Sequence, residues 1–387
     1  MAGVLAGGGW LRRTQYLHGD RDRTSLGGQQ QTQPRVTGPN AQRVPSNRYQ
    51  TELDAFSARR NHTGLQASIR FGDGTGWHGV AGHADHDRQR PLGAAHHLYI
   101  GSVTKLFTAT LVLRHVQRDV LSLSDPIDNW IDLDEADGIT VRMLLNHTSG
   151  IPNYTENPWF IARYFGRPTK HWAPTELVNI IRRDDLRFQP GMRHEYSNSN
   201  YILLGVILER ATETAYCDLI RQLIRDELGY DDTYYLGYPA TVPIANAYDE
   251  SIFKIGRRNL TGFRTSLETG AYAAGGILST APDVAGVVND LFNGRILDEA
   301  TLDAMRTFVD APDEDVTTQE EYGLGLRHLR IDGKDLYGHT GTIPGYSVIA
   351  MHHDDPEYTI AVLSNVSTID QAGIYGALQR ITLEEYY

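Results

Sequence analysis

The stretch YIGSVTKLFTATLVLRHV (residues 99–116) decides the fold prediction, because it joins a helix to a candidate nucleophile. The expected helix begins at or beside Ser102 and puts Lys105 one turn further along, on the same face. An unprotonated lysine amine there could accept the proton of the serine hydroxyl, which is otherwise a poor nucleophile. One stripe of side chains recurs at steps of three and four residues, as in an amphipathic helix: Val103, Leu106, Thr110, Leu113, Val116 and Val120.

The segment before this helix is predicted to form another helix followed by two strands. Residues 48–61 have a helical pattern. Residues 65–71 alternate between apolar and polar side chains, which is typical of a half-buried strand. Gly72-Asp73-Gly74 then supplies a turn into a second strand near Val80.

The segment after the 99–116 helix predicts more helices and then a return to strands. Residues 121–249 have helical patterns between Pro/Gly loops, and they include YILLGVILERA (residues 201–211), which is apolar enough for a buried helix. Strands are expected at Tyr346–Met351 and Thr359–Leu363, and a last amphipathic segment runs from Ile369 to Ile381. We therefore expect an α/β (α+β) fold in which a mixed sheet is built from both chain ends and helices are inserted between them.

The same patterns suggest how the chain is divided. Residues 1–47 are rich in Gly, Gln, Arg and Thr without periodic apolar positions, so we expect a disordered N-terminal extension. Residues 48–387 are expected to form one hydrolase-sized unit. In it, a mixed α/β subdomain of residues 48–120 and 250–387 accompanies a helical subdomain of residues 121–249.

Composition excludes several classes of protein. The 387 residues are enough to bury a large core. A formal net charge of -12 disfavours nucleic acid as a partner. The single cysteine, Cys217, allows neither an intramolecular disulfide nor a thiolate zinc site. The sequence has neither an apolar run that could span a membrane nor the apolar core of a signal peptide, and it leaves the compartment open.

Two further segments carry groups suited to the same chemistry as Ser102. Tyr196-Ser197-Asn198 stands just before the predicted buried helix, where the phenol could relay a proton and the Asn198 amide could bind a substrate carbonyl. His339-Thr340-Gly341-Thr342 stands ahead of a predicted strand. Gly341 would permit close approach of a backbone, and the Thr342 N–H could join the Ser102 N–H in an oxyanion hole.

Each of these motifs is weak alone. Ser251-Ile252-Phe253-Lys254 repeats the Ser102–Lys105 spacing by chance, a Tyr beside an Asn is commonly core and cap, and His-Thr-Gly is commonly a turn. Their combination is specific, because S-x-x-K, Y-x-N and H-T-G follow one another in the order of the motifs S-x-x-K, S-D-N and K-T-G.

From this combination, the chain resembles the serine β-lactamase-like and penicillin-binding-protein family, in its class C β-lactamase and D-alanyl-D-alanine carboxypeptidase branch. The resemblance covers roughly residues 50–385. It implies an antiparallel sheet flanked by helices. Family-like stretches also occur around and between the three motifs, and they read YIGSVTKLFTATLVLRHV, LSLSDPI, MLLNHTSGIPNY, FQPGMRHEYSNSNYILLGVILE, GGILSTAPDVA, YGLGL and YGHTGTIPGYS.

The resemblance implies roles for individual residues. Ser102 would be the acylated nucleophile, and Lys105 and Tyr196 would transfer protons. Asn198 would bind a substrate amide. His339 and Thr340 would form the floor and the anchoring hydroxyl of the pocket. A histidine where K-T-G has lysine is more similar to carboxypeptidases and esterases than to class C β-lactamases.

An arginine ahead of the H-T-G strand pairs with the substrate carboxylate in the carboxypeptidase branch. Arg327 stands in the similar stretch YGLGLR, and we expect it to serve as that anchor together with the Thr342 hydroxyl. Arg330 is close by, but side chains alternate between the faces of a strand.

Other candidate sites are less well supported by the sequence. Residues 82–87 (GHADHD) have a faint likeness to a metallo-hydrolase motif but lack an H-x-H pair. The neighbouring pairs His96-His97 and His352-His353 are poorly placed for joint chelation. Asn146-His147-Thr148-Ser149-Gly150 combines His and Ser, but the resemblance implies a structural turn there.

The leading hypothesis is a metal-free serine hydrolase without a cofactor, which acts through an acyl-enzyme on a small molecule or a peptide ending in D-alanine. An esterase or D-amino-acid amidase on the same site is the alternative, and a β-lactamase is a weaker one. A receptor that is acylated by a wall peptide or a β-lactam without turnover remains a non-enzymatic alternative. A wall carboxypeptidase would work outside the cytoplasm, and the other activities inside it.

Overall fold

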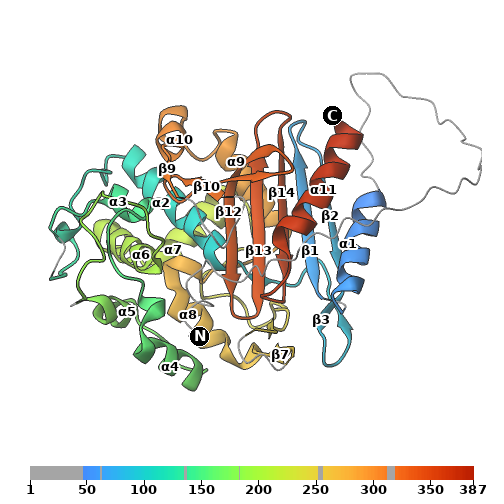
Figure 1. Ribbon diagram of the computed structural model, residues 1–387, viewed down its shortest axis with the longest axis horizontal. Helices are drawn as coiled ribbons and strands as arrows, with labels where there is room; N and C mark the ends of the chain where they lie inside the picture. Colours follow the sequence, from blue (N-terminus) through green and yellow to red (C-terminus); the bar gives the residue numbers. More distant parts are fainter. Residues whose placement is uncertain (1–46, 62, 135–136, 183, 252–255, 312–318) are drawn as a thin grey trace, which may run out of the picture.

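An eight-stranded sheet forms the centre of the computed structural model, which describes residues 47–61, 63–134, 137–182, 184–251, 256–311 and 319–387 (Figure 1). Every neighbouring pair of strands in this sheet is antiparallel, so the antiparallel arrangement is confirmed and the expectation of a mixed sheet is wrong. In spatial order its strands are β2 (Gly76–Ala81), β1 (Leu65–Phe71), β14 (Tyr358–Ser364), β13 (Tyr346–His353), β12 (Lys334–Ile343), β11 (Arg327–Ile331), β10 (Gln319–Tyr322) and β9 (Val309–Asp310).

The two ends of the folded chain meet within this sheet. Strand β1 pairs with β14 from Leu65 opposite Ser364 to Phe71 opposite Tyr358. The prediction of a sheet built from both chain ends is therefore confirmed. Three short pairs lie outside the main sheet: β3 (His83–Asp85) with β4 (Arg90–Pro91), β5 (Leu98–Tyr99) with β8 (Leu278–Ser279), and β6 (Tyr248–Asp249) with β7 (Arg258–Asn259).

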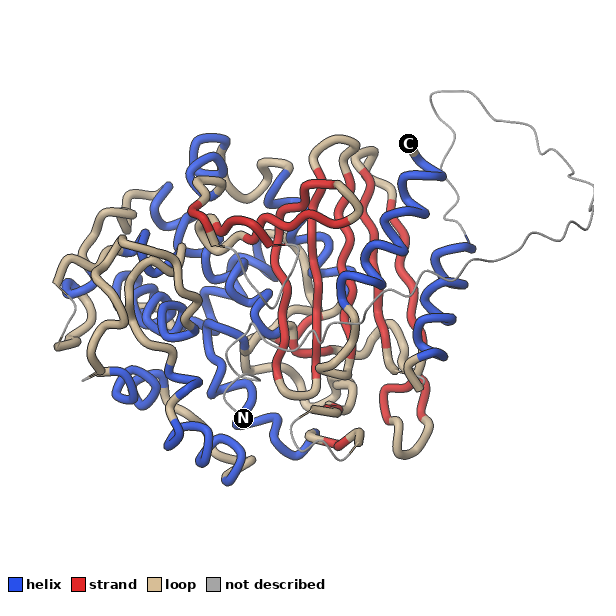
Figure 2. Tube along the Cα trace, viewed as in Figure 1, coloured by secondary structure: helices blue, strands red, loops and turns tan. Residues whose placement is uncertain are grey.

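Helices cover both faces of the sheet (Figure 2). Helices α1 (Asn47–Arg59) and α11 (Gln371–Tyr386) lie over one face, and α9 (Ala281–Phe292) packs on β1, β13 and β14 from the other. Strand β1 is consequently buried on both faces, and the expectation of a half-buried strand is wrong. The polar side chains on its second face have internal partners, since the Gln66 amide donates to the carbonyl of His96 at 2.7 Å.

The remaining helices form a second body beside the sheet. Helix α6 (Asn198–Thr212) contains the apolar stretch 201–211 and is buried, as predicted. Helix α8 (Arg264–Gly275) lies beyond residue 249 in the chain, yet it packs against α6 and α2 (Thr104–Gln117). No helix in the described ranges has the length and apolar character needed to cross a membrane. The other α-helices are α3 (Val141–Leu145), α4 (Pro158–Gly166), α5 (Pro174–Ile181), α7 (Tyr216–Ile220) and α10 (Glu299–Met305).

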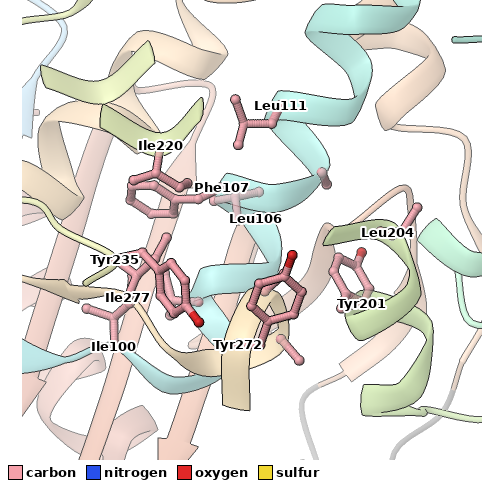
Figure 3. Packing of buried hydrophobic residues seen from close by; sticks show 14 of the residues in the cluster. Ile100, Leu106, Phe107, Leu111, Tyr201, Leu204, Ile220, Tyr235, Tyr272 and Ile277 are labelled. Carbon is pink, nitrogen blue, oxygen red and sulfur yellow. The ribbon is translucent and has the colours of Figure 1, made fainter. Parts of the chain in front are cut away.

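Helix α2 runs through the centre of the larger apolar core (Figure 3). It packs against α6, α7 and α8. Because α2 is enclosed on nearly all sides, Leu111 and Val112 are buried together with the predicted stripe up to Leu113, and Val116 is half-buried. The stripe ends earlier than expected, since α2 ends at Gln117 and the side chain of Val120 is 44% exposed.

Candidate active site

A 3-10 turn at Gly101–Val103 presents Ser102 directly before α2, where only 4% of the residue is exposed. Gly101 adopts a left-handed φ of +51°. Strand β12 lies close behind this turn, because a Cβ on Gly341 would stand 2.2 Å from the Ile100 carbonyl oxygen and 3.0 Å from the Ser102 nitrogen. Glycine at position 341 therefore lets the backbone near Thr342 approach the backbone of Ser102.

Lys105 lies one turn beyond Ser102, and three polar groups fix its amine. The Nζ atom stands 3.1 Å from Ser102 Oγ, 2.7 Å from Asn198 Oδ1 and 2.8 Å from the Ala274 carbonyl oxygen. The last two groups can only accept, so a neutral amine donates its two N–H groups to them and turns its lone pair to the Ser102 hydroxyl. Three elements, α2, α6 and α8, thus hold one amine against the serine hydroxyl. The lysine and the serine have the contact that the i, i+3 spacing predicted.

The environment of Lys105 favours its neutral amine. Burial lowers the pKa of Lys105 well below its ordinary value, and the positive charge of Arg327 lowers it further. The protonated amine loses hydration in this site without gaining a carboxylate among its hydrogen-bond partners. A neutral lysine can accept a proton, which is the property that a base for Ser102 requires.

Tyr196 lies beside this amine in the segment that leads into α6. Lys105 Nζ stands 4.9 Å from the centroid of the Tyr196 ring. The ring of Tyr196 also lies near the ring of His147, at 4.4 Å between centroids, and its centroid is 5.4 Å from the Arg327 guanidinium. The structure therefore brings Ser102, Lys105 and Tyr196 together, as the sequence predicted.

Asn198 begins α6 and connects the Lys105 amine to the loop that follows α3. Its Oδ1 accepts a hydrogen bond from Lys105, while its Nδ2 points toward Asn153 Oδ1 and Thr155 Oγ1, each at 3.4 Å. The Asn198 backbone N–H also donates to Asn153 Oδ1, at 3.2 Å. The amide is thereby oriented, and Asn198 lines the pocket beside Ser102.

The H-T-G-T segment belongs to β12. Its residues differ in whether they line the pocket beside Ser102. Thr342 lines the pocket, whereas His339 is completely buried behind it. The His339 Nδ1 faces the Thr340 carbonyl, so Nδ1 carries the proton and Nε2 accepts from the Tyr322 hydroxyl at 2.9 Å. Burial and the charge of Arg327 lower the pKa of His339 well below its ordinary value.

Arg327 lies on β11 next to this histidine, opposite Gly338. It is only 1% exposed, and the pocket beside Ser102 is formed by other residues. Its guanidinium lies close to the Tyr196 ring, and its positive charge lowers the pKa of Lys105 and of His339.

Polar and aromatic residues both line the pocket beside Ser102. The polar residues include Ser102, Asn198 and Thr342. The aromatic side chains come from the 3-10 turn Tyr154–Glu156 and from α4, and they form an aromatic wall. Every lining residue within the described part of the chain is uncharged: Gly101, Ser102, Tyr154, Thr155, Phe160, Tyr164, Asn198, Gly270, Ala271, Ala274, Gly275, Thr342, Ile343 and Pro344.

Local sequence explains why α4 presents its rings here. Asn157 caps the helix by accepting from the N–H groups of Trp159 and Phe160, at 3.0 and 3.4 Å, and Pro158 occupies the first helical position. Phe160 and Tyr164 are four residues apart, so both lie on the buried face.

Sequence reasoning missed several residues of this site. The Ala274 carbonyl that accepts from Lys105 has no sequence signal, because every residue has a carbonyl. The aromatic wall also lacks a motif, although Tyr154 stands at the end of the stretch MLLNHTSGIPNY. His147 was expected to serve a structural turn, yet its ring contacts Tyr196.

The weaker candidate sites do not form comparable arrangements. Ser251 Oγ donates to Asp249 Oδ1, and Lys254 lies outside the described residues. Within the described residues, no three His, Cys, Asp or Glu side chains are grouped so that they could hold a metal ion, residues 82–87 included.

Comparison with known proteins assigns the chain to a family. The chain belongs to the Beta-lactamase family, which matches residues 50–381. It is 25% identical over 334 residues to penicillin-binding protein 4* of Bacillus subtilis (strain 168), covering 82% of this chain and 71% of that protein.

Solved structures with a similar fold include two amide hydrolases. D-amino acid amidase from Ochrobactrum anthropi SV3, complexed with L-phenylalanine amide, has a TM-score of 0.76 and 29% identity, over 87% of this chain and 97% of that chain. D-stereospecific amidohydrolase from Streptomyces sp. has a TM-score of 0.74 and 29% identity, over 88% and 99% of the two chains. The protein is accordingly a serine hydrolase of the β-lactamase and penicillin-binding-protein superfamily.

Proposed function

We propose that this protein is an amidohydrolase that cleaves small amides of apolar amino acids through an acyl-enzyme on Ser102. The observation that carries the proposal is the uncharged pocket, which is lined by aromatic side chains and by Ser102, Asn198 and Thr342. Such a site suits an apolar side chain whose amide carbonyl lies beside the serine. The similarity to D-amino acid amidase, at 29% identity, supports the same substrate class and suggests the D configuration.

Acylation begins when Ser102 Oγ gives its proton to the neutral Lys105 amine, 3.1 Å away. The oxygen attacks the amide carbonyl carbon, and the carbonyl oxygen becomes an oxyanion bound by the N–H groups of Ser102 and Thr342. The C–N bond then breaks. Tyr196 gives its proton to the leaving nitrogen and regains one from the Lys105 ammonium, so that an amine leaves and an ester remains on Ser102.

Deacylation reverses the direction of proton transfer. A water molecule gives a proton to the Lys105–Tyr196 pair, and its oxygen attacks the ester carbonyl. The bond from the acyl carbon to Ser102 Oγ breaks, and Oγ takes the proton back. The products are a carboxylic acid and the original serine.

A D-alanyl-D-alanine carboxypeptidase is the second candidate, favoured by one observation. Arg327 places a buried positive charge next to Tyr196, 5.4 Å from its ring centroid, and the field of this charge would favour a substrate that carries a carboxylate. Arg327→Ala distinguishes the candidates. Arg330→Ala is the matched control, because Arg330 lies on the same strand as Arg327 and pairs with Asp335 on β12.

If Arg327 anchors a carboxylate, Arg327→Ala lowers kcat/KM for a D-Ala-D-Ala peptide by about 1.5–3 kcal/mol and spares an uncharged p-nitrophenyl ester. Equal losses on both substrates would instead assign Arg327 to the electrostatics of Lys105 and Tyr196. Arg330→Ala should affect neither substrate.

The test of the proposed function is a turnover panel on the purified full chain. It compares kcat/KM for D-phenylalanine amide, L-phenylalanine amide, a D-Ala-D-Ala peptide, a p-nitrophenyl ester and nitrocefin. We expect the D-amide to be preferred, and intact-mass spectrometry with the ester should find one adduct that is lost in Ser102→Ala and retained in Ser251→Ala.

The other results would contradict the proposal. Preference for the peptide, the ester or nitrocefin would identify a carboxypeptidase, an esterase or a β-lactamase, respectively. A stable Ser102 adduct with no turnover of any substrate would identify a receptor.

A further inference from the structure

His147 occupies the centre of the buried polar cluster behind the active site. It follows the short helix α3 and adopts a left-handed φ of +59°. The residue is completely buried. Aromatic rings surround its imidazole, with centroid distances of 4.4 to 5.7 Å, from Tyr196, Tyr322, Tyr201 and His194.

His147 contacts the catalytic segment 195–200 at three points. Its carbonyl accepts from the Glu195 N–H at 3.0 Å. Its Nδ1 stands 3.3 Å from the Ser197 nitrogen and 3.0 Å from Asn200 Nδ2. These contacts bracket Tyr196 and Asn198, the two residues of this segment that lie against Lys105.

The partners of Nδ1 define the tautomer of His147. The Ser197 backbone nitrogen is a donor. The Asn200 amide is oriented by Ser149 Oγ, which donates to its Oδ1 at 2.7 Å, so Nδ2 is the group that faces His147. Nδ1 therefore accepts two hydrogen bonds, and the proton of the neutral imidazole resides on Nε2.

Burial, together with the basic groups around His147, keeps the imidazole neutral. Burial lowers its pKa well below the ordinary value, and nearby basic groups lower it further. A protonated Nδ1 would itself be a donor, and it would then face the two donors of Ser197 and Asn200 without an acceptor between them. The titratable and charged groups that act on this ring are His194, Lys105, His339 and Arg327, besides the tyrosines in contact with it.

We propose that His147 is a positioning residue, whose Nδ1 fixes segment 195–200 so that the Tyr196 ring and the Asn198 amide stand against the Lys105 amine. This inference rests on the proposed acyl-enzyme reaction, but it assigns a role that the S-x-x-K, Y-x-N and H-T-G motifs leave out. The asparagine Oδ1 occupies nearly the place of histidine Nδ1, and asparagine tolerates a left-handed φ. His147→Asn therefore keeps the acceptor, and the similarly shaped His147→Leu removes it.

The kinetic experiment compares these two variants with the wild type and with His115→Leu. His115 is another buried histidine, and its Nδ1 contacts the Leu111 carbonyl in α2, away from segment 195–200. We expect His147→Leu to lower kcat by about 10- to 100-fold on the best substrate, because small misplacements of catalytic groups have effects of that size. KM should change much less, since the pocket wall is untouched.

His147→Asn should restore most of kcat, and His115→Leu should lower only the melting temperature. Equal losses in His147→Asn and His147→Leu would overturn the proposal, because the ring and not the acceptor would then matter. An unchanged kcat in His147→Leu would overturn it as well.

A second measurement does not depend on activity or on the folding of a variant. Nitrogen-15 NMR of the histidine side chains in the wild-type protein should find His147 with an unprotonated Nδ1 and a protonated Nε2 at neutral pH. A protonated Nδ1 would overturn the inference. A wild type with the expected tautomer but without hydrolysis of any panel substrate would contradict the proposed function alone.

Discussion

The proposed chemistry of this site depends on the amine of Lys105. Its three hydrogen-bond partners come from the 3-10 turn before α2, from α6 and from α8, and burial together with Arg327 lowers its pKa. Tyr196 adjoins the same amine, 4.9 Å from ring centroid to Nζ. The two side chains are therefore expected to bind and release protons as one unit.

This coupling predicts non-additive losses of rate. Lys105→Ala and Tyr196→Phe should each reduce kcat by at least about 100-fold, the scale of general acid–base catalysis. The double variant should lose little more than either single one, because removing one member already disables the pair. Rapid-quench measurement of acylation tests this expectation, and losses that multiply fully would assign the two residues separate roles.

Local spacing explains which residues the sequence could predict. Ser102 and Lys105 are three residues apart on one turn, so a motif is enough to bring them together. The tautomer of His147 and the carbonyl of Ala274 depend on the approach of segments far apart in the chain. Arg327 could be singled out as a candidate, but its burial behind Tyr196 follows only from the packing of β11.

Among the elements, α8 joins the active site to a second buried titratable group. Ala274 at its end accepts from Lys105, and Glu268 lies further back on the same helix, only 4% exposed. Glu268 accepts from the Leu236 N–H and from the Tyr238 hydroxyl, each at 3.3 Å. Burial raises the pKa of Glu268 to about 7.

Because Glu268 lies on α8, its raised pKa makes the free energy of unfolding depend on pH. A carboxyl with a higher pKa in the folded state contributes stability below its unfolded pKa, near 4.3, and loses it as pH rises through about 7. Glu268→Gln should therefore raise the free energy of unfolding at pH 8 by up to about 3 kcal/mol and change it little at pH 4.

Urea unfolding of wild type and variant across this range measures the difference. Glu213→Gln, an exposed change at the end of α6, is the control and should show no such dependence. A constant difference between wild type and Glu268→Gln at all pH values would contradict the prediction, because it would mean that Glu268 has the same pKa in the folded and unfolded states.

The type of an element, helix or strand, could be predicted where the periodicity of its apolar residues marks the buried face. The period of α2 and the alternation of β1 gave the correct type of element. They did not reveal that α9 covers the second face of β1 or that α2 is enclosed by α6 and α7. Periodicity describes the local face of an element, whereas its surroundings depend on pairing between β1 and β14, from opposite ends of the chain.

At the scale of the whole molecule, the first helix joins the two chain ends. Helix α1 buries Tyr49, Leu53 and Phe56. The Tyr49 hydroxyl bonds Thr382 Oγ1 on α11 at 3.0 Å. The described part of the chain begins at residue 47, the first residue of α1, so the expected extension of residues 1–47 otherwise lies outside the described residues.

This arrangement predicts that the fold starts with α1. A chain shortened to begin at Asn47 should keep the melting temperature and kcat/KM of the full chain, because residues 1–46 lack the apolar pattern needed to pack on the body.

A chain that begins at Leu65 is the control. It removes three buried side chains, each contributing about 1.5–3 kcal/mol, and should unfold at a much lower temperature. Differential scanning calorimetry of both shortened chains tests the boundary. A loss of stability or activity in the chain that begins at Asn47 would mean that residues 1–46 pack on the folded body and contribute to its stability or to the site.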